Sequence, residues 1–110
     1  NMPTSYKVLG QVATSGGASV DLYISPNNVN AVCSTLSACV IGNTSYLRVA
    51  CVPSGQTIAQ KNYIVYDTYV NQYDTLFLTL GVTMSSGDKM TVYASGGGPV
   101  AFSLFGSEIY

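Results

Sequence analysis

The stretch Ala31–Val52, AVCSTLSACVIGNTSYLRVACV, decides the fold class. It contains two runs of alternating apolar and polar residues, Ala31–Ile41 and Ser45–Val52, separated by Gly42 and Asn43. Alternation with a period of two is typical of a strand that buries one face. A short turn between two such runs predicts a β-hairpin. The stretch therefore predicts two antiparallel strands of an all-β domain.

The register of this hairpin assigns a face to each side chain. A two-residue turn at Gly42-Asn43 places Ala38 opposite Leu47 and Leu36 opposite Val49. The predicted core face consists of Val32, Leu36, Ala38, Val40, Leu47, Val49 and Cys51. The opposite face, polar but nearly uncharged, consists of Thr35, Ser37, Cys39, Tyr46 and Arg48.

The same alternation continues along the rest of the chain. Segments rich in Gly, Ser, Asn and Pro interrupt it, and these residues favour turns. We expect strands over Tyr6–Val12, Ala18–Ile24, Ala31–Ile41, Ser45–Val52, Asn62–Asp67, Asp74–Leu80, Lys89–Ser95 and Val100–Phe105. The sequence predicts an all-β, two-sheet antiparallel β-sandwich of about eight strands, either a jelly roll or immunoglobulin-like. We expect a single domain over residues 6–110, preceded by an N-terminal arm over residues 1–5.

Charge is scarce in this chain. Four residues are Lys or Arg and five are Asp or Glu, which is 8 % of 110 residues, whereas an average domain carries roughly a quarter. Cores of protein interfaces are depleted in charge and enriched in tyrosine, and the chain has nine tyrosines. The composition therefore predicts a structural subunit whose surface is covered by partners.

The same composition argues against an enzyme. The chain has no histidine to activate a nucleophile, and its cysteines and acids lack the spacing of a metal site. Asp67 and Asp74 flank one connection, while Asp21, Asp88 and Glu108 lie apart, so we interpret each as a turn or strand-end residue. The net charge of −1 gives no attraction to nucleic acid or to acidic lipid. We expect no catalytic residue, cofactor, metal, nucleic acid or membrane partner.

The cysteines and the N-terminus indicate a reducing compartment. Cys33, Cys39 and Cys51 are odd in number, and Cys33 and Cys39 lie about 20 Å apart in one extended strand. A disulfide needs Cα atoms within about 7 Å, so we expect three free thiols. The polar N-terminus does not resemble a signal peptide. We expect Asn1 to be a tag remnant and Met2 the natural first residue.

Two of the predicted strands are apolar on both faces. In one, Leu76, Leu78 and Leu80 face one way and Phe77 the other. In the other, Val100, Phe102 and Leu104 face inward and leave Ala101 and Phe105 outward. Such strands either lie beneath a loop or contact another subunit, and the low charge favours subunit contact. Our candidate oligomer-interface residues are Phe77, Tyr93, Phe105 and Tyr110.

Tyrosines cluster at Tyr63, Tyr66, Tyr69 and Tyr73, among Asn, Gln and Asp residues. Such a cluster can pack at a sandwich edge with its hydroxyls in water, form a subunit interface, or bind sugars. Tyr63 and Tyr66 are the candidate glycan contacts. The absence of tryptophan, the largest stacking platform, disfavours sugar binding.

Several segments, in this order, resemble a family of small virion proteins of tailed bacteriophages, including phages of cyanobacteria. The resemblance extends from Tyr6 to Ile109 and consists of strand and turn patterns rather than a catalytic signature. The segments are YKVLGQ from Tyr6, DLYISP from Asp21, AVCSTL from Ala31, RVACV from Arg48, NYIVYD from Asn62, Asp74-Thr75, Leu80-Gly81-Val82, Gly87-Asp88, and FGSEI from Phe105.

The resemblance implies a β-sandwich that acts in virion assembly. Some family members are trimeric cement, or decoration, proteins on the outer capsid, and related sandwiches occur as distal modules of tail spikes and fibres. It implies a homotrimer that binds the major capsid protein on the outer capsid surface and is assembled in the bacterial cytoplasm. We expect Met2, Pro3, Thr4 and Ser5 to contact the capsid. The alternative is a receptor- or carbohydrate-binding module that recognises a host surface glycan.

Overall fold

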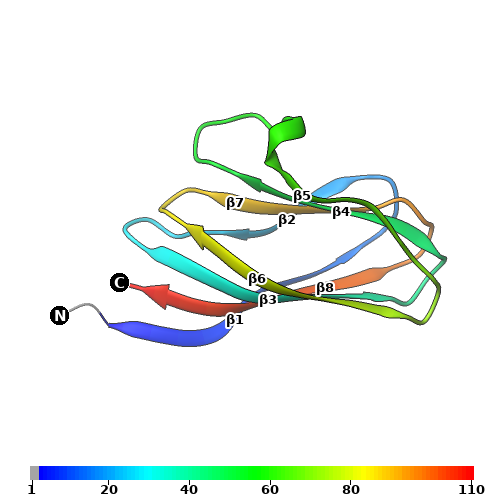
Figure 1. Ribbon diagram of the computed structural model, residues 1–110, viewed down its shortest axis with the longest axis horizontal. Helices are drawn as coiled ribbons and strands as arrows, with labels where there is room; N and C mark the ends of the chain where they lie inside the picture. The colour runs from blue at the N-terminus through cyan, green and yellow to red at the C-terminus, as the bar shows by residue number, and fades with distance from the viewer. Residues whose placement is uncertain (1–2) are drawn as a thin grey trace.

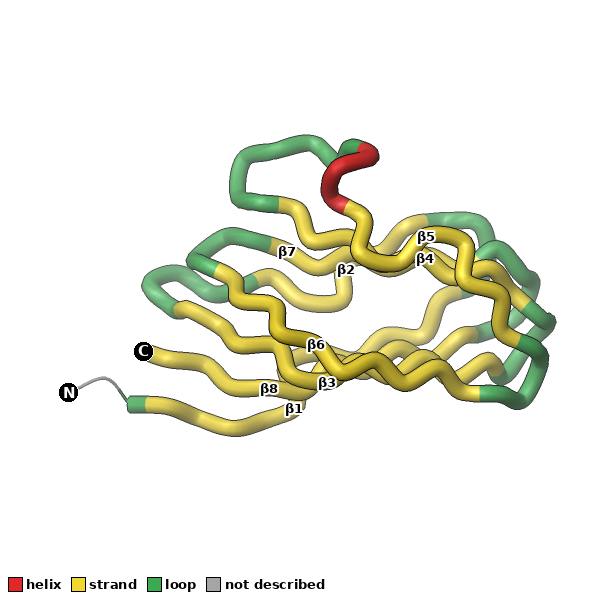
Figure 2. Tube along the Cα trace, viewed as in Figure 1, coloured by secondary structure: helices red, strands yellow, loops and turns green. Residues whose placement is uncertain are grey.

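The computed structural model describes residues 3–110, which form two stacked four-stranded sheets (Figure 1). Sheet A contains, in spatial order, β1 (Thr4–Thr14), β8 (Val100–Ile109), β3 (Asn30–Val40) and β6 (Thr75–Met84). Sheet B contains β2 (Ser19–Ile24), β7 (Lys89–Ala94), β4 (Ser45–Val52) and β5 (Tyr63–Val70). A 3₁₀ turn, η1 (Gln60–Asn62), lies in the connection above sheet B (Figure 2). The predicted two-sheet antiparallel sandwich of eight strands is confirmed.

The strand order follows one rule. The first strand pairs with the last, the second with the seventh, the third with the sixth and the fourth with the fifth, always antiparallel. The chain is thus a long hairpin that has been rolled over into two sheets. This is the jelly roll, in which two Greek keys form eight strands, so the strand order selects this alternative over the immunoglobulin-like one.

The prediction that β3 and β4 pair as a hairpin is wrong. β3 lies in sheet A and β4 in sheet B, so the turn at Gly42-Asn43 joins the two sheets. Ala38 pairs with Leu76 and Phe102 rather than with Leu47. The turn instead packs on the connection between β7 and β8, where the backbone N–H of Asn43 donates to the carbonyl of Gly97 at 2.8 Å. Alternation determines which face a residue occupies but not which strand pairs with it.

The core lies between the sheets and agrees with most of the predicted faces. Leu36, Ala38, Val40, Leu47 and Val49 are fully buried, and Cys51 packs against them half-buried. Val32 is the exception, since it is 36 % exposed and Cys33 is buried in its place. The register of β3 shifts between Cys33 and Thr35 against both of its neighbours. This bulge reverses the alternation at the start of the strand.

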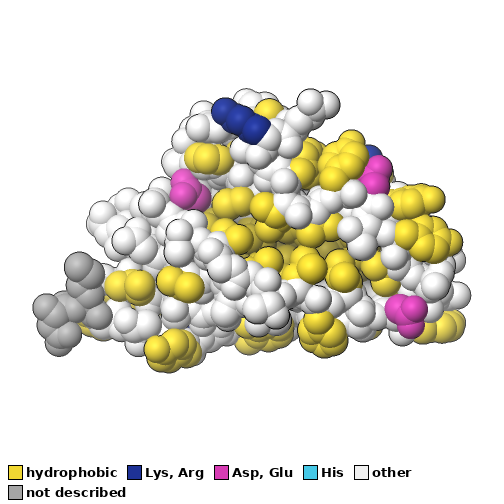
Figure 3. All heavy atoms as spheres, viewed as in Figure 1, with side chains coloured by type: hydrophobic (Ala, Val, Ile, Leu, Met, Phe, Trp, Pro, Cys, Tyr) yellow, Lys and Arg dark blue, Asp and Glu magenta, His cyan; other side chains and the backbone are white. Residues whose placement is uncertain are grey.

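The two open sides of the sandwich differ. On the side of β1 and β2 the backbones approach so closely that a Cβ atom at Gly10 would collide with the carbonyl oxygen of Leu22. On the side of β5 and β6, hydrophobic side chains are visible between the two layers (Figure 3). The sandwich is therefore closed along the side of β1 and β2. Along the side of β5 and β6, a strip of hydrophobic side chains between the two sheets stays open, and we call this strip the seam. No helix within residues 3–110 is long and apolar enough to cross a membrane.

Gly106 of β8 occupies a position that excludes any side chain. A Cβ atom there would collide with the backbone carbonyl of Val32, beside the bulge of β3. We expect Gly106→Ala to lower the free energy of unfolding by about 1–3 kcal/mol, the usual cost of overpacking, measured by urea denaturation. Gly81→Ala is the matched control, because a Cβ atom at Gly81 meets open space. Equal losses in both variants would contradict this account.

Candidate functional site: the uncharged outer face of sheet A

The outer face of sheet A carries no charged residue among those that the structure describes. Strand register and burial place the following residues on it: Thr4, Tyr6, Val8, Gln11, Ala13, Asn30, Val32, Ser34, Thr35, Ser37, Cys39, Thr75, Phe77, Thr79, Gly81, Thr83, Ala101, Ser103, Phe105, Ser107 and Ile109. Four adjacent strands thus present one continuous surface of apolar, hydroxyl and amide side chains. A continuous surface without charge, with large apolar side chains among hydroxyl groups, is a candidate interaction site.

Large apolar side chains stand out from this face. Tyr6 is 85 % exposed and Phe77 is 71 % exposed. Phe105 is half-buried and, with Tyr6, Val8 and Val32, lines a hollow of about 540 Å³. Lys7 of β1 also lines the hollow, and its ammonium group is bound to Glu108. The face therefore offers both a projecting ring and a concave apolar surface, as packing against another protein requires.

The charged side chains of the strands are concentrated on the opposite sheet. On the outer face of sheet B, Arg48 Nε lies 2.5 Å from an oxygen of Asp67, and Lys89 Nζ lies 3.9 Å from an oxygen of Asp21. Exposed ion pairs contribute little to stability. Their placement instead keeps the outer face of sheet B compatible with water, while the described residues on the outer face of sheet A are uncharged.

Sheet B also carries the tyrosine cluster. The guanidinium of Arg48 lies over the rings of Tyr66, at 4.3 Å, and Tyr93, at 4.7 Å. Tyr63 packs edge-on against Tyr66 with ring centroids 4.9 Å apart, and these two residues and Gln60 line a hollow of about 360 Å³. The predicted glycan contacts, Tyr63 and Tyr66, are therefore adjacent and accessible.

The four predicted oligomer-interface residues do not form one patch. Phe77 and Phe105 lie on the outer face of sheet A, whereas Tyr93 faces outward on sheet B beside Arg48. Tyr110 follows β8, and its hydroxyl donates to Glu108. Alternation predicted that Phe77 and Phe105 point away from the core, and the structure confirms it. The strand order was needed to show that they share a face that lacks charge.

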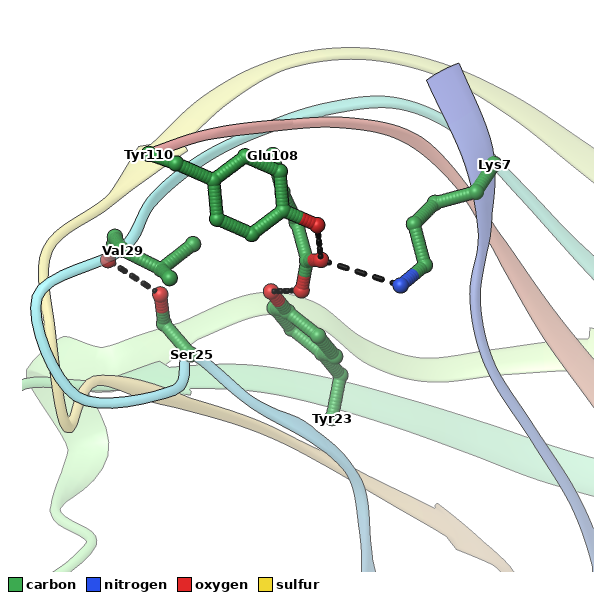
Figure 4. Close-up of polar contacts among 6 residues, drawn as sticks. All are labelled: Lys7, Tyr23, Ser25, Val29, Glu108 and Tyr110. Atoms are coloured by element: carbon green, nitrogen blue, oxygen red, sulfur yellow. Dashed lines mark hydrogen bonds and ion pairs between the residues drawn. The ribbon is translucent and has the colours of Figure 1, made fainter. Parts of the chain in front are cut away.

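Glu108 is a buried carboxylate that sequence reasoning missed. It is 3 % exposed and accepts hydrogen bonds from Tyr23 at 2.6 Å, Tyr110 at 2.8 Å and Lys7 at 3.0 Å (Figure 4). Its partners come from β1, from β2 and from the residue after β8, so the cluster joins the two sheets at one end. A buried charge needs such partners. No residue spacing in the sequence predicts which side chains would bind Glu108.

Hydrogen bonding in this cluster shifts the pKa values of its members. The hydrogen bonds from Tyr23, then from Lys7 and Tyr110, hold the pKa of Glu108 below its usual 4.5. The hydrogen bond to Glu108 raises the pKa of Lys7. Burial, followed by the hydrogen bond to Glu108, raises the pKa of Tyr23. The cluster thus consists of a carboxylate, an ammonium group and two neutral phenols over a wide range of pH.

The predicted N-terminal arm is part of sheet A where the structure describes it. Thr4 and Ser5 belong to β1, opposite Ile109 and Glu108, and the carbonyl of Pro3 accepts from the N–H of Tyr110 at 2.9 Å. Asn1 and Met2 lie outside the described residues. The capsid contact assigned to Pro3, Thr4 and Ser5 therefore falls at the edge of the uncharged face.

The three cysteines are free, as expected, and Cys33 is buried. Burial raises the pKa of the Cys33 thiol to about 11, so at neutral pH this thiol is protonated and unreactive. Within residues 3–110 no group of three or more Cys, Asp or Glu residues could hold a metal ion.

Replacement of Glu108 by Gln tests the cluster. The variant loses charge-assisted hydrogen bonds, and we expect a loss of about 1–3 kcal/mol in the free energy of unfolding at neutral pH. Because the folded-state pKa of Glu108 is lowered, its stabilisation is present above its usual pKa and disappears as the pH falls through the folded-state pKa. Urea denaturation of both proteins should therefore show a difference that vanishes in acid. A difference that is constant with pH would exclude the charge of Glu108 as its cause.

Comparison with known proteins found no matching family model and no curated relative. Among solved structures, the chain is similar to a chain of infectious bursal disease virus strain Gx, with a TM-score of 0.57 and 11 % identity over 99 % of this chain. It is also similar to a chain of the T13 particle of the same virus, with a TM-score of 0.58 and 14 % identity over 99 % of this chain. The match covers 32 % and 30 % of those chains, so this chain spans about a third of their length.

A third similarity is to a chain of the acid-stable capsid of Helicobacter pylori bacteriophage KHP30. The TM-score is 0.55 and the identity 15 %, over 100 % of this chain and 94 % of the phage chain. At this identity the likeness concerns the fold. The jelly roll described above thus occurs in viral particles both as one part of a long chain and as a chain of nearly this length.

Proposed function

We propose that the protein is a non-enzymatic structural component of a virion. In its specific form, we propose a homotrimeric decoration protein on the outer surface of a bacteriophage head, which binds the major capsid protein. The observation that carries the proposal is that none of the described residues on the outer face of sheet A is charged. The ring size of three and the position on the head rest on the resemblance to phage cement proteins.

The size of this face fits an interface. Four strands of about ten residues cover roughly 600 Å², and a stable protein interface buries roughly 800 Å² on each partner. With its projecting side chains, such as Tyr6 and Phe77, the face approaches that value. In such a contact the exposed apolar side chains of the face, Tyr6 and Phe77 among them, would be removed from water.

The comparisons support a capsid component. The phage chain to which this protein is similar is nearly coextensive with it and belongs to a capsid structure.

A decoration protein stabilises a capsid by joining several subunits at once. In a trimer, each protomer makes the same weak contact with the shell. Linked contacts of this kind raise the overall affinity by a factor of about 10² or more without any new contact. A face rich in threonine, serine and aromatic side chains suits this role, because it binds without depending on the salt concentration.

A second candidate function is carbohydrate binding by the tyrosine cluster of sheet B. The hollow beside Gln60, Tyr63 and Tyr66 combines two aromatic rings with an amide group. Sugars are bound by such surfaces, because C–H groups pack on the rings while hydroxyls bond to amides. This candidate describes a receptor-binding module of a tail spike or fibre.

The double variant Phe77→Asp/Phe105→Asp tests the main proposal. We expect wild-type protein to show a native mass near three times 11.6 kDa in light scattering and to co-sediment with undecorated phage heads. Charges on the outer face of sheet A should reduce head binding at least tenfold. The matched control is Tyr66→Asp/Tyr69→Asp, on sheet B. Unchanged binding of the first variant, or loss of binding by the control alone, would refute the assignment of the face.

The variant Tyr66→Ala tests the second candidate. If the hollow holds a sugar, the wild-type protein should bind host lipopolysaccharide on a glycan array. The Tyr66→Ala variant should not bind it, since stacking on one ring contributes a large share of the affinity. Tyr73→Ala, an exposed tyrosine in the turn before β6, is the control. Absence of any glycan binding by the wild-type protein excludes this candidate.

A further inference from the structure

β6 is an edge strand of sheet A whose outer edge is unpaired in the described chain. An edge strand presents a row of free N–H and C=O groups, which can pair with another strand. Proteins protect such edges with charged residues, proline, bulges or short strands. Four strands of this sandwich are edges, namely β1 and β6 in sheet A, and β2 and β5 in sheet B.

Three of the four edges carry such protection. Lys7 lies in β1, Asp21 in β2 and Asp67 in β5, and the alternation of exposed and buried residues is broken in each of these strands. β6, with the sequence TLFLTLGVTM, contains neither a charged residue nor proline. Its alternation is unbroken from Thr75 to Met84, although its register against β3 shifts at one point. β6 is thus the edge suited to pairing with another strand.

The inward side chains of β6 need further cover. Leu76, Leu78, Leu80 and Val82 pack against the core but remain only partly buried. They lie along the seam on the side of β5 and β6, where hydrophobic atoms are visible between the two layers (Figure 3). A strand added next to β6 would bury both this seam and the free backbone groups.

We propose that this strand is β6 of a second copy, paired antiparallel about a two-fold axis at Thr79. Any strand can pair with its own copy in this way, and the contact is then the same on both partners. Because β6 is uncharged, such pairing sets no like charges opposite one another, a conflict that destabilises strand pairs. Self-pairing of the other edges would bring copies of Lys7, Asp21 or Asp67 together.

The side chains of β6 are complementary in this register. Opposite residues of an antiparallel pair lie on the same face, so with Thr79 at the axis, Leu78 lies opposite Leu80 and Leu76 opposite Val82. On the outer face, Phe77 of each copy lies opposite Gly81 of the other. Gly81 has open space where a Cβ atom would stand, and an aromatic ring across from a strand glycine is a stabilising pair.

The pairing extends sheet A to eight strands and doubles its uncharged outer face. It concerns a two-fold contact and does not depend on the proposed trimer. In a shell that holds trimers, the same contact links neighbouring trimers to one another. A single strand pair is a small interface, so it forms at high local concentration, as on the surface of a particle.

The test is disulfide cross-linking of the purified full chain under oxidation, read on a non-reducing gel. Thr79 is exposed, so Thr79→Cys should fold, and circular dichroism checks this. In the proposed pair, the two Thr79 Cα atoms lie about 4.5–5.5 Å apart, within the about 7 Å of a disulfide. We expect Thr79→Cys to form covalent dimers, and the wild type, with its three native thiols, to form none.

Two further variants fix the register. Thr75→Cys and Thr83→Cys should each remain monomeric alone, since each is separated from its own copy by roughly 26 Å. A mixture of the two should form dimers, because Thr75 lies opposite Thr83. Absence of dimers from Thr79→Cys at high protein concentration would overturn the pairing. Dimers from Thr83→Cys alone, or none from the mixture, would overturn the register. Neither result bears on head binding, because the cross-links are measured on the purified chain in the absence of heads.

Discussion

The constraint on which the rest of the structure depends is the pairing of the two halves of the chain in reverse order, β1 with β8 through β4 with β5. It brings β1, β8, β3 and β6 side by side, and the outward residues of these strands are all uncharged. It also places Arg48, Asp67, Asp21 and Lys89 together on the other sheet. Glu108 then joins the first, second and last strands at one end. The distribution of charge over the two faces is therefore a consequence of topology.

The sequence predicted the strands and most of their faces, because each depends on local alternation. It could not predict the partners of the strands. The turn at Gly42-Asn43 satisfies the pattern of a hairpin, yet it packs against Gly97 and joins the two sheets. Val32 was assigned to the core, but a bulge after Cys33 reverses the alternation. A bulge leaves no mark in the sequence, because it depends on the neighbouring strands.

The candidate site was predictable in kind but not in extent. The scarcity of charge indicated a covered surface, and alternation directed Phe77 and Phe105 outward. Only the strand order showed that these two residues share one face and that Tyr93 lies on the other. Glu108 was interpreted as a strand-end acid, since its three partners lie 2, 85 and 101 residues away along the chain. Polar clusters whose members lie far apart in the chain cannot be predicted from local sequence patterns.

The central claim is that the outer face of sheet A is buried when the protein is assembled on a particle. Hydroxyl-radical footprinting of decorated heads and of the free protein measures this burial residue by residue. The account predicts that Tyr6, Phe77 and Phe105 are protected in the assembled state, whereas Tyr66 and Tyr69 on sheet B react equally in both. Protection of Tyr66 and Tyr69, with Phe77 and Phe105 still reactive, would contradict it.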